Sequence, residues 1–118
     1  MRRVGAIISV GQGYLCQLRD DRPDIEWPSH WALFGGHVDE GETDMEAIRR
    51  ELREELGWVP SHLMKVCERD GIAYFHCRND DLSLLSQREG QAMGVFSPRH
   101  LPKPMIPYVK QLLSEYAS

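Results

Sequence analysis

Runs of apolar residues along the chain predict several short strands separated by turns. Residues 2–10 and 13–19 are β-prone segments on either side of a glycine-containing turn. Residues 63–79 are interpreted as two further strands around an Arg-Asp-Gly turn, and residues 91–96 as a last short strand. Residues 31–38 form a brief apolar run that contains a glycine pair.

Two other segments show features typical of helices. Thr43, followed three positions later by Glu46, is a capping box, and Gly57 stands where a helix commonly ends, so a helix is expected between them. Residues 106–117 are expected to form a second helix, with one face made of Val109, Leu112, Leu113 and Tyr116.

The order of these segments bounds the fold. A chain of 118 residues supports one domain with one core, covering residues 1–118. Strands mixed with two helices predict an α/β or α+β sandwich, in which the helices pack on a mixed sheet. The polar, proline-broken stretch 20–30 is expected to be a long loop, and such loops often carry function.

The first expected helix concentrates glutamates on one face. With Glu51 at 0° on a helical wheel, Glu54 and Glu55 fall at roughly −60° and 40°. The apolar stripe expected to be buried lies between roughly 60° and 140° and consists of Met45, Ile48, Leu52 and Leu56. The three carboxylates therefore reach the edge of the stripe instead of lying opposite to it.

Carboxylates placed this way favour a metal site over a solvated acidic face. Like charges at three- and four-residue spacing repel each other by roughly 0.2–0.5 kcal/mol per pair. Arg50 can pair with Glu46 and Glu54, but it borders the cluster and does not neutralise it. Hard divalent cations take carboxylate oxygens, and Mg²⁺ in particular is held by a few carboxylates together with substrate phosphates.

Composition and charge argue against several classes of function. The formal net charge of −4 opposes broad binding to nucleic acid or to anionic membranes. No apolar run is long enough to span a membrane, and no cleavage site of a signal peptide is visible. Cys16, Cys67 and Cys77 contain no CxxC pair and are interpreted as reduced thiols of a cytoplasmic protein. The five histidines show no paired metal-ligand spacing.

A spaced pattern of glycines and charged residues spans residues 36–58. It consists of Gly36, Glu42, Arg50, Glu51, Leu52, Glu54, Glu55, Gly57 and Trp58, with Trp58 where an aliphatic residue is usual. This pattern resembles the Nudix box, and the order of the flanking strands is similar to that of the Nudix fold, an α/β/α sandwich. The resemblance implies hydrolysis of a nucleoside diphosphate linked to another moiety, with Mg²⁺ or Mn²⁺ as the cofactor.

The resemblance also implies ligands for the metal. The glutamates that match Glu51, Glu54 and Glu55 bind metal in such proteins, often with a main-chain carbonyl of the glycine pair, here Gly35. One carboxylate then serves as general base, and which glutamate does so stays open.

Other positions of the pattern have supporting roles in the family. The arginine that matches Arg50 orients a catalytic glutamate. The glutamate that matches Glu42 braces the turn between loop and helix, and Gly36 and Gly57 are the structural glycines of the box.

Three positions bear on substrate choice. Phe34 stands where the family commonly has proline before the glycine pair. Glu89, in the run Arg-Glu-Gly-Gln, resembles a glutamate that approaches the metal in mutator-type members, so it is a candidate ligand or base; the alternative is an exposed loop acid. Met105 aligns near an asparagine that reads guanine in those members, and methionine offers no such hydrogen bonds. Specificity for oxidised guanine is therefore not expected.

Aromatic residues around the long loop have two interpretations. Trp27, Trp31 and Phe34 either stack on a base or belong to the core, and the core is favoured. Arg19 either reaches a phosphate or is an exposed arginine at a strand end. Arg19, Trp31, Phe34 and Met105 are accordingly the candidate substrate-binding residues.

The main functional prediction is a pyrophosphohydrolase that converts a nucleoside triphosphate to its monophosphate. Its first alternative is a nucleotide-sugar or ADP-ribose hydrolase. The alternative of another class is a catalytically idle domain that senses a nucleotide, although such domains usually lose the glutamates that this chain keeps. A small nucleotide is the expected partner, and monomer and homodimer both remain open.

Overall fold

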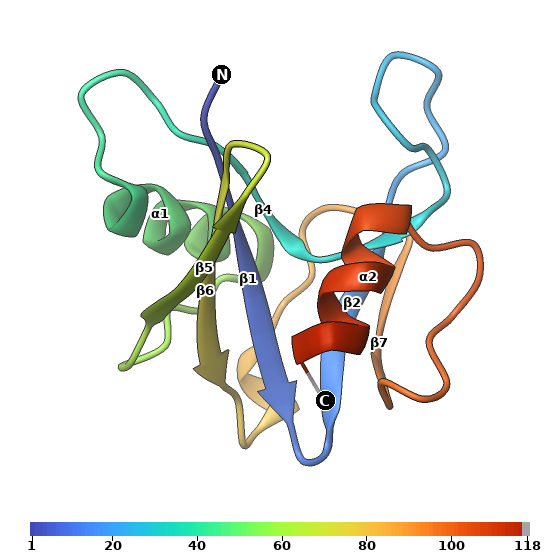
Figure 1. Cartoon of the computed structure of the whole chain (residues 1–118). Helices are drawn as coiled ribbons and strands as arrows, with labels where there is room; N and C mark the ends of the chain where they lie inside the picture. The colour runs from blue at the N-terminus through green and yellow to red at the C-terminus, as the bar shows by residue number, and fades with distance from the viewer. Residues whose placement is uncertain (117–118) are drawn as a thin grey trace.

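The computed structural model describes residues 1–116 (Figure 1). The elements, in chain order, are β1 (Arg3–Val10), β2 (Gly13–Leu18), β3 (Trp31–Ala32), β4 (Phe34–His37), α1 (Asp44–Leu56), β5 (Met64–Arg69), β6 (Ile72–Arg78), the short 3-10 helix η1 (Leu82–Leu84), β7 (Ala92–Phe96) and α2 (Pro107–Tyr116).

Strand β1 organises the sheet because both of its edges are paired. On one edge it pairs in parallel with β6, which in turn pairs antiparallel with β5. The other edge is divided, since β4 pairs antiparallel with β1 from Arg3↔His37 to Ala6↔Phe34, whereas β2 joins only from Ser9 onward. Strand β2 extends the sheet to β3 and β7. Strands β4 and β2 therefore share one edge of β1.

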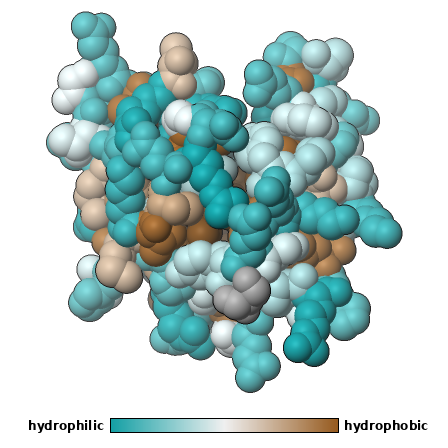
Figure 2. All heavy atoms as spheres, in the orientation of Figure 1, coloured by the Kyte–Doolittle hydropathy of each residue, from teal (hydrophilic) through white to brown (hydrophobic). Residues whose placement is uncertain are grey.

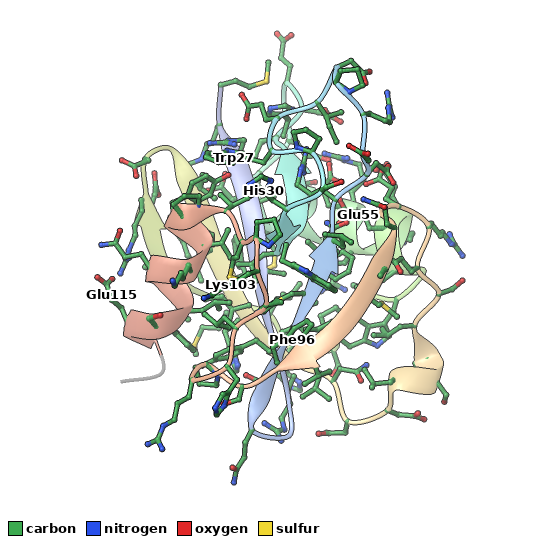
Figure 3. All side chains as sticks on the ribbon, turned by 90° about the vertical axis from the view of Figure 1, so that its right-hand side faces the viewer. Trp27, His30, Glu55, Phe96, Lys103 and Glu115 are labelled. Carbon is green, nitrogen blue, oxygen red and sulfur yellow. The ribbon has the colours of Figure 1, made fainter. Side chains whose placement is uncertain are left out.

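Two apolar clusters lie on opposite faces of this mixed sheet. Ala6 and Ile8 of β1 pack in the same cluster as Leu52 of α1, whereas Ile7 packs in the same cluster as Leu112 of α2. Successive residues of a strand point to opposite faces, so the two helices cover different faces. Figure 3 shows Glu55 of α1 and Glu115 of α2 on opposite sides of the sheet. The expected α/β/α sandwich is confirmed.

The ends of α1 follow from local chemistry. The Thr43 side chain accepts a hydrogen bond from Glu46 N, and the Glu46 carboxylate accepts one from Thr43 N. Gly57 ends the helix with φ 62°, and its N–H donates to Arg53 O at 2.9 Å. The capping box and the glycine end were both predicted, and the helix spans the expected residues.

Several expectations need correction. The apolar run 31–38, for which no element was specified, forms two short strands, β3 and β4, separated by Leu33. Met45 was expected in the buried stripe of α1 but is 37% exposed, whereas Ala47 is buried instead. The short helix η1 was not predicted. Helix α2 follows the expected face, and Ala117, the last residue of the predicted helix, lies outside the described residues.

The surface in Figure 2 is mostly hydrophilic, and apolar residues appear on it in small separate groups. No helix within residues 1–116 has the length and apolar character that a membrane span requires.

Candidate active site

The glycine pair of β4 gives α1 its close approach to the sheet. Gly35 has φ 153°, and a Cβ there would lie 2.1 Å from Val4 O, so no side chain fits. A Cβ on Gly36 would lie 2.5 Å from Glu51 Oε1. The backbone of β4 therefore lies directly against the carboxylate of Glu51, which a larger residue would displace.

The three glutamates near this contact differ in how deeply they are buried. The side chain of Glu54 is 58% exposed and that of Glu51 is 14% exposed. Glu55 is buried at 2% exposure, and its Oε2 accepts a hydrogen bond from Gly35 N at 3.1 Å. The predicted face thus reaches deeper than the edge of the core, because Glu55 is part of the buried surface.

Burial makes the negative charges of the two inner glutamates unfavourable. It raises the pKa of Glu55, and the neighbouring carboxylates of Glu51 and Glu89 raise this pKa further. Burial also raises the pKa of Glu51, although Arg50 opposes the change. Without a cation, this pair of carboxyls therefore retains a proton that an exposed pair would lose.

Arg50 connects the acidic face to the loop before α1. Its Nε and Nη2 donate to both carboxylate oxygens of Glu42, at 2.8 and 3.0 Å, and Nη2 also donates to His37 O at 2.9 Å. Its Nη1 donates to Glu51 at 2.9 Å and to Glu54 at 3.3 Å. The Arg50 side chain is thus directed to Glu42, and the Glu46 carboxylate takes part in the helix cap.

Glu42 is the fixed point of this network. Its Oε1 also accepts a hydrogen bond from Asp39 N at 3.0 Å. Arg50 and this backbone N–H lower the pKa of Glu42 to about 2. A carboxylate that stays ionised over the whole neutral range therefore holds the turn between β4 and α1, at the position predicted for a bracing residue.

The donor set fits a hard divalent cation. Oxygen ligands from several carboxylates suit Mg²⁺ or Mn²⁺ better than a softer metal. Glu55 is buried beside Glu51, whose carboxylate occupies the space next to Gly36 that a side chain there would fill. A cation would stabilise this pair of acids. Across residues 1–116, no three Asp, Glu, His or Cys side chains are grouped as a ready-made metal site.

The segment 86–91 closes the site from the other end of α1. Ser86 N donates to Leu56 O at 2.9 Å, and Arg88 N donates to Glu55 O at 2.8 Å. Glu89 is exposed on this segment, close enough to Glu55 for its charge to raise the pKa of that residue. The structure thus brings the predicted Glu89 to the predicted glutamates of α1.

A cavity of about 410 Å³ begins at the glycine pair and extends over the α2 face of the sheet. Its walls include Arg3, Arg19, Trp27, Phe34, Tyr74 and Tyr108. Arg19 and Phe34 were candidates for substrate binding, and both line this cavity.

Trp31 and Met105, the other two candidates, do not line the cavity. Trp31 packs edge-on against Phe96, with ring centroids 4.9 Å apart, and forms a β-bridge with Met105. Met105 is 8% exposed and belongs to the apolar cluster under α2. The structure favours the core interpretation for these two residues, because the Phe96 ring and the bridge fill the space around them.

The loop 20–29 forms the outer wall of the cavity and is closed at its base. Arg19 N donates to His30 O at 2.9 Å, and Ser29 N donates to Asp20 O at 3.2 Å. Gln91 Nε2 donates to Arg19 O at 2.8 Å and to Ser29 Oγ at 3.0 Å. The loop that carries Trp27 is therefore tied to the same segment as Glu89.

Arg3, Tyr74 and Tyr108 are cavity residues that the sequence pattern did not single out. They come from β1, β6 and α2, and they meet because β1 pairs in parallel with β6 under α2. The alternation of β6 places Tyr74 on one face, but nothing in the sequence states that this face is open at Tyr74.

Comparison with known proteins agrees with this geometry. The family model of the NUDIX domain matches residues 1–109. The nucleoside triphosphatase NudI of Escherichia coli O139:H28 is 53% identical over 47 residues, which are 40% of this chain and 32% of that protein. The chain thus matches about a third of the length of this relative.

Solved structures share the fold over almost the whole chain. The MutT NUDIX hydrolase of Burkholderia pseudomallei is 25% identical with a TM-score of 0.70, over 95% of this chain and 94% of that one. The protein DR0079 of Deinococcus radiodurans has a TM-score of 0.82 at 20% identity, over 97% of this chain and 81% of that one. With its family match over residues 1–109 and the glutamate face on α1, the chain belongs to the Nudix family.

Proposed function

We propose that this chain hydrolyses a diphosphate linkage in a nucleoside diphosphate derivative, and that a nucleoside triphosphate is its preferred substrate. The observation that carries the proposal is the graded burial of Glu54, Glu51 and Glu55, the last of which is hydrogen-bonded to Gly35, a residue that also lines the cavity. Acids in this arrangement suit a polyanionic substrate only in the presence of cations, which is the chemistry of phosphoryl transfer.

The residues that would hold Mg²⁺ or Mn²⁺ are Glu51, Glu54, Glu55 and Glu89, with the carbonyl of Gly35. Such an ion, when bound, neutralises phosphate charge and lowers the pKa of a bound water. The carboxylate of the buried Glu55 is held in place, because Gly35 N donates a hydrogen bond to it.

Arg50 positions the outer acids of the site. Its bidentate pair with Glu42 fixes the guanidinium, and the remaining Nη1 contacts Glu51 and Glu54. Of these acids, Glu54 is the most exposed, so its carboxylate is accessible to an attacking water. Glu54 accepts the proton of that water, oxygen bonds to phosphorus, and the bond to the leaving pyrophosphate breaks.

Two observations support a triphosphate. The cavity of about 410 Å³ beside the glycine pair has the size of a small-molecule site. The relative that is 53% identical over its matched segment is named a nucleoside triphosphatase.

A panel of nucleoside triphosphates, ADP-ribose and nucleotide sugars, each with Mg²⁺, tests the proposal. We expect monophosphate and pyrophosphate from a triphosphate, and label from ¹⁸O-water on a phosphate oxygen of one product. Exhaustive chelation should abolish turnover, and excess Mg²⁺ should restore it. Faster cleavage of ADP-ribose would overturn the preference, and nucleotide binding without any turnover would indicate a sensor domain.

A matched pair of variants locates the chemistry. Glu54→Gln removes the exposed site carboxylate and should lower kcat by roughly 10²-fold or more, with the thermal midpoint kept. Glu40→Gln removes an exposed carboxylate of the preceding loop and should leave kcat unchanged. If the thermal midpoint of Glu54→Gln collapsed together with its rate, Glu54 would be a structural residue.

A further inference from the structure

A second hollow shares part of its lining with the cavity at the glycine pair. The second hollow has a volume of about 400 Å³ and extends toward Arg69 and Gln111. Both hollows are lined by Arg3, Ile72, Tyr74 and Tyr108. These residues form the boundary between the hollows. If the phosphates of a nucleotide lie at the glycine pair, its other end, the nucleobase, lies toward this boundary.

Tyr74 is the most buried polar residue at this boundary. The residue is 3% exposed, and its ring lies against Gly5, where an added Cβ would be 3.0 Å from Tyr74 Cε1. Burial raises the pKa of Tyr74 to about 12, so the hydroxyl is protonated at neutral pH and carries a proton to donate.

The Tyr74 hydroxyl has no hydrogen-bond partner among residues 1–116, and Tyr74 lines both hollows. A polar group that lines a hollow without a protein partner is free to form a hydrogen bond with a ligand there.

The acids of the cavity wall already have cationic partners. Asp24 pairs with Arg22 at 2.6 Å, and Glu26 lies 3.8 Å from Arg3. The Arg3 guanidinium also acts on Tyr74, whose pKa it lowers against the effect of burial. The remaining hydrogen-bonding groups at the boundary can both donate: the Tyr74 hydroxyl donates as well as accepts, and the Arg3 N–H groups only donate.

We propose that this boundary is a subsite for a nucleobase that carries an exocyclic oxygen, to which Tyr74 donates a hydrogen bond and Arg3 a second one. The inference rests on the proposed nucleotide substrate and names the base that the same site prefers. A base with an amino group at the corresponding position directs N–H groups at the Arg3 guanidinium, which cannot accept a hydrogen bond. Uracil and hypoxanthine, which carry an oxo group where cytosine and adenine carry the amino group, are therefore preferred over those two bases.

Calorimetric binding of monophosphates tests the subsite without any turnover. UMP and CMP differ in the exocyclic group at C4 and in the proton on the adjacent ring nitrogen, and IMP and AMP differ in the same way at C6. The unmodified protein with Mg²⁺ should bind the oxo member of at least one pair about tenfold more tightly, and Tyr74→Phe should weaken that member by about fivefold with the amino member unchanged. Equal weakening of both members, or a preference for the amino member, would overturn the proposal.

Tyr14→Phe is the matched control. Tyr14 lies on β2 in the same apolar cluster and is 8% exposed, but it contacts Tyr116 and lines neither hollow. Its variant should keep the full oxo preference. If Tyr74→Phe fails to fold, Arg3→Gln replaces it, and the oxo preference should again fall severalfold. The absence of hydrolysis in the substrate panel refutes the enzyme, whereas the absence of an oxo preference in the unmodified protein refutes the subsite.

Discussion

At the scale of single residues, exposure differentiates three glutamates of the same chemistry. Glu54 is exposed to solvent, Glu51 is mostly buried and pairs with Arg50, and Glu55 is buried beside Gly35. Burial raises the pKa of Glu51 and that of Glu55, so the acids of one helix face are not equivalent. The buried member makes the stability of the cation-free protein dependent on pH.

Replacement of Glu55 by glutamine should stabilise the cation-free protein in alkaline solution. Burial raises the pKa of Glu55 in the folded state above its ordinary value of 4.5. Above pH 4.5 the unfolded chain therefore releases this proton while the folded chain keeps it, and stability falls as pH rises. In EDTA, urea unfolding should show Glu55→Gln more stable than the unmodified protein by about 1 kcal/mol or more at pH 8, with little difference at pH 4.

The same pair of proteins reports on the cation. Mg²⁺ binds the ionised acid, so it should raise the Tm of the unmodified protein more at pH 8 than at pH 5. The Tm of Glu55→Gln should respond less. An equal response of both proteins to Mg²⁺ would contradict a role of Glu55 in holding the ion.

Gly36→Ala should damage the site more than the fold. The added methyl group would lie 2.5 Å from Glu51 Oε1, so the carboxylate must move. A displacement of this size is expected to lower kcat by roughly 10²-fold, and overpacking should lower stability by about 1–3 kcal/mol. Turnover and urea unfolding of the same preparation measure both effects.

Gly41→Ala is its control. Gly41 has φ 80° and open space around its Cβ position, so alanine there strains the backbone without touching a glutamate. The variant should lose stability and retain kcat. If both variants lose activity in proportion to stability, the contact between Gly36 and Glu51 has no special importance.

At the scale of elements, α1 is the part of the molecule that depends most on local signals. Its start is fixed by Thr43 and Glu46, its end by Gly57, and its polar face by glutamate spacing. All of these lie within one helix, so the sequence predicts them without knowledge of the sheet.

The helix cap supports a specific stability prediction. Thr43→Ala removes the side-chain acceptor of Glu46 N and should cost about 1 kcal/mol in urea unfolding. The glutamates are more than one turn away, so kcat should change little. Ser61→Ala, an exposed change outside the helices, should leave stability unchanged. A loss of kcat without a loss of stability would instead connect the cap to catalysis.

The elements also show where sequence reasoning stops. The buried arc of α1 was expected to centre on the apolar stripe, but it also includes Glu55 and Ala47, whereas Met45 in the first turn of the helix is exposed. The angle at which a helix meets a sheet is a property of both partners, and only one of them can be read from the helix itself. The Leu33 break between β3 and β4 depends likewise on pairing with two different strands.

The cavity residues depend on contacts that are remote in sequence. Arg3 and Tyr74 meet through the parallel pairing of β1 with β6, and Tyr108 reaches them from α2. Parallel strands need a long crossover, so their register leaves no short-range signal. The glutamate face of α1 was thus predictable from the sequence, whereas the boundary of the cavity required the structure.

At the scale of the whole molecule, Arg2 joins three parts of the chain. It precedes β1 and donates to Asp44 in the first turn of α1 and to Glu68 of β5, with Nη1 2.8 Å from Glu68 Oε1. Its guanidinium lowers the pKa of Asp44, and together with Lys65 it lowers the pKa of Glu68 to about 2. The network ties the helix layer to the edge of the sheet.

Removal of this arginine should reduce the acid resistance of the fold. Carboxyls with lowered pKa values stabilise the folded state above their ordinary pKa, and this stabilisation is lost as pH falls from about 4.5 toward 2. Arg2→Gln should therefore lower Tm slightly at pH 7 in low salt, and the difference should vanish near pH 2. High salt should reduce the difference at pH 7, because the pairs are exposed. A Tm difference independent of pH would point to packing of the arginine stem.

The closed base of loop 20–29 separates two tasks within this molecule. Because Arg19 N and His30 O join the two ends of the loop, its length and composition can change while the flanking strands keep their register. Trp27 belongs to the loop, whereas the glutamates and the glycine pair belong to α1 and β4. A graft of another sequence between the two ends of this loop can therefore alter which molecule enters the cavity, and the glutamates proposed as catalytic need not be rebuilt.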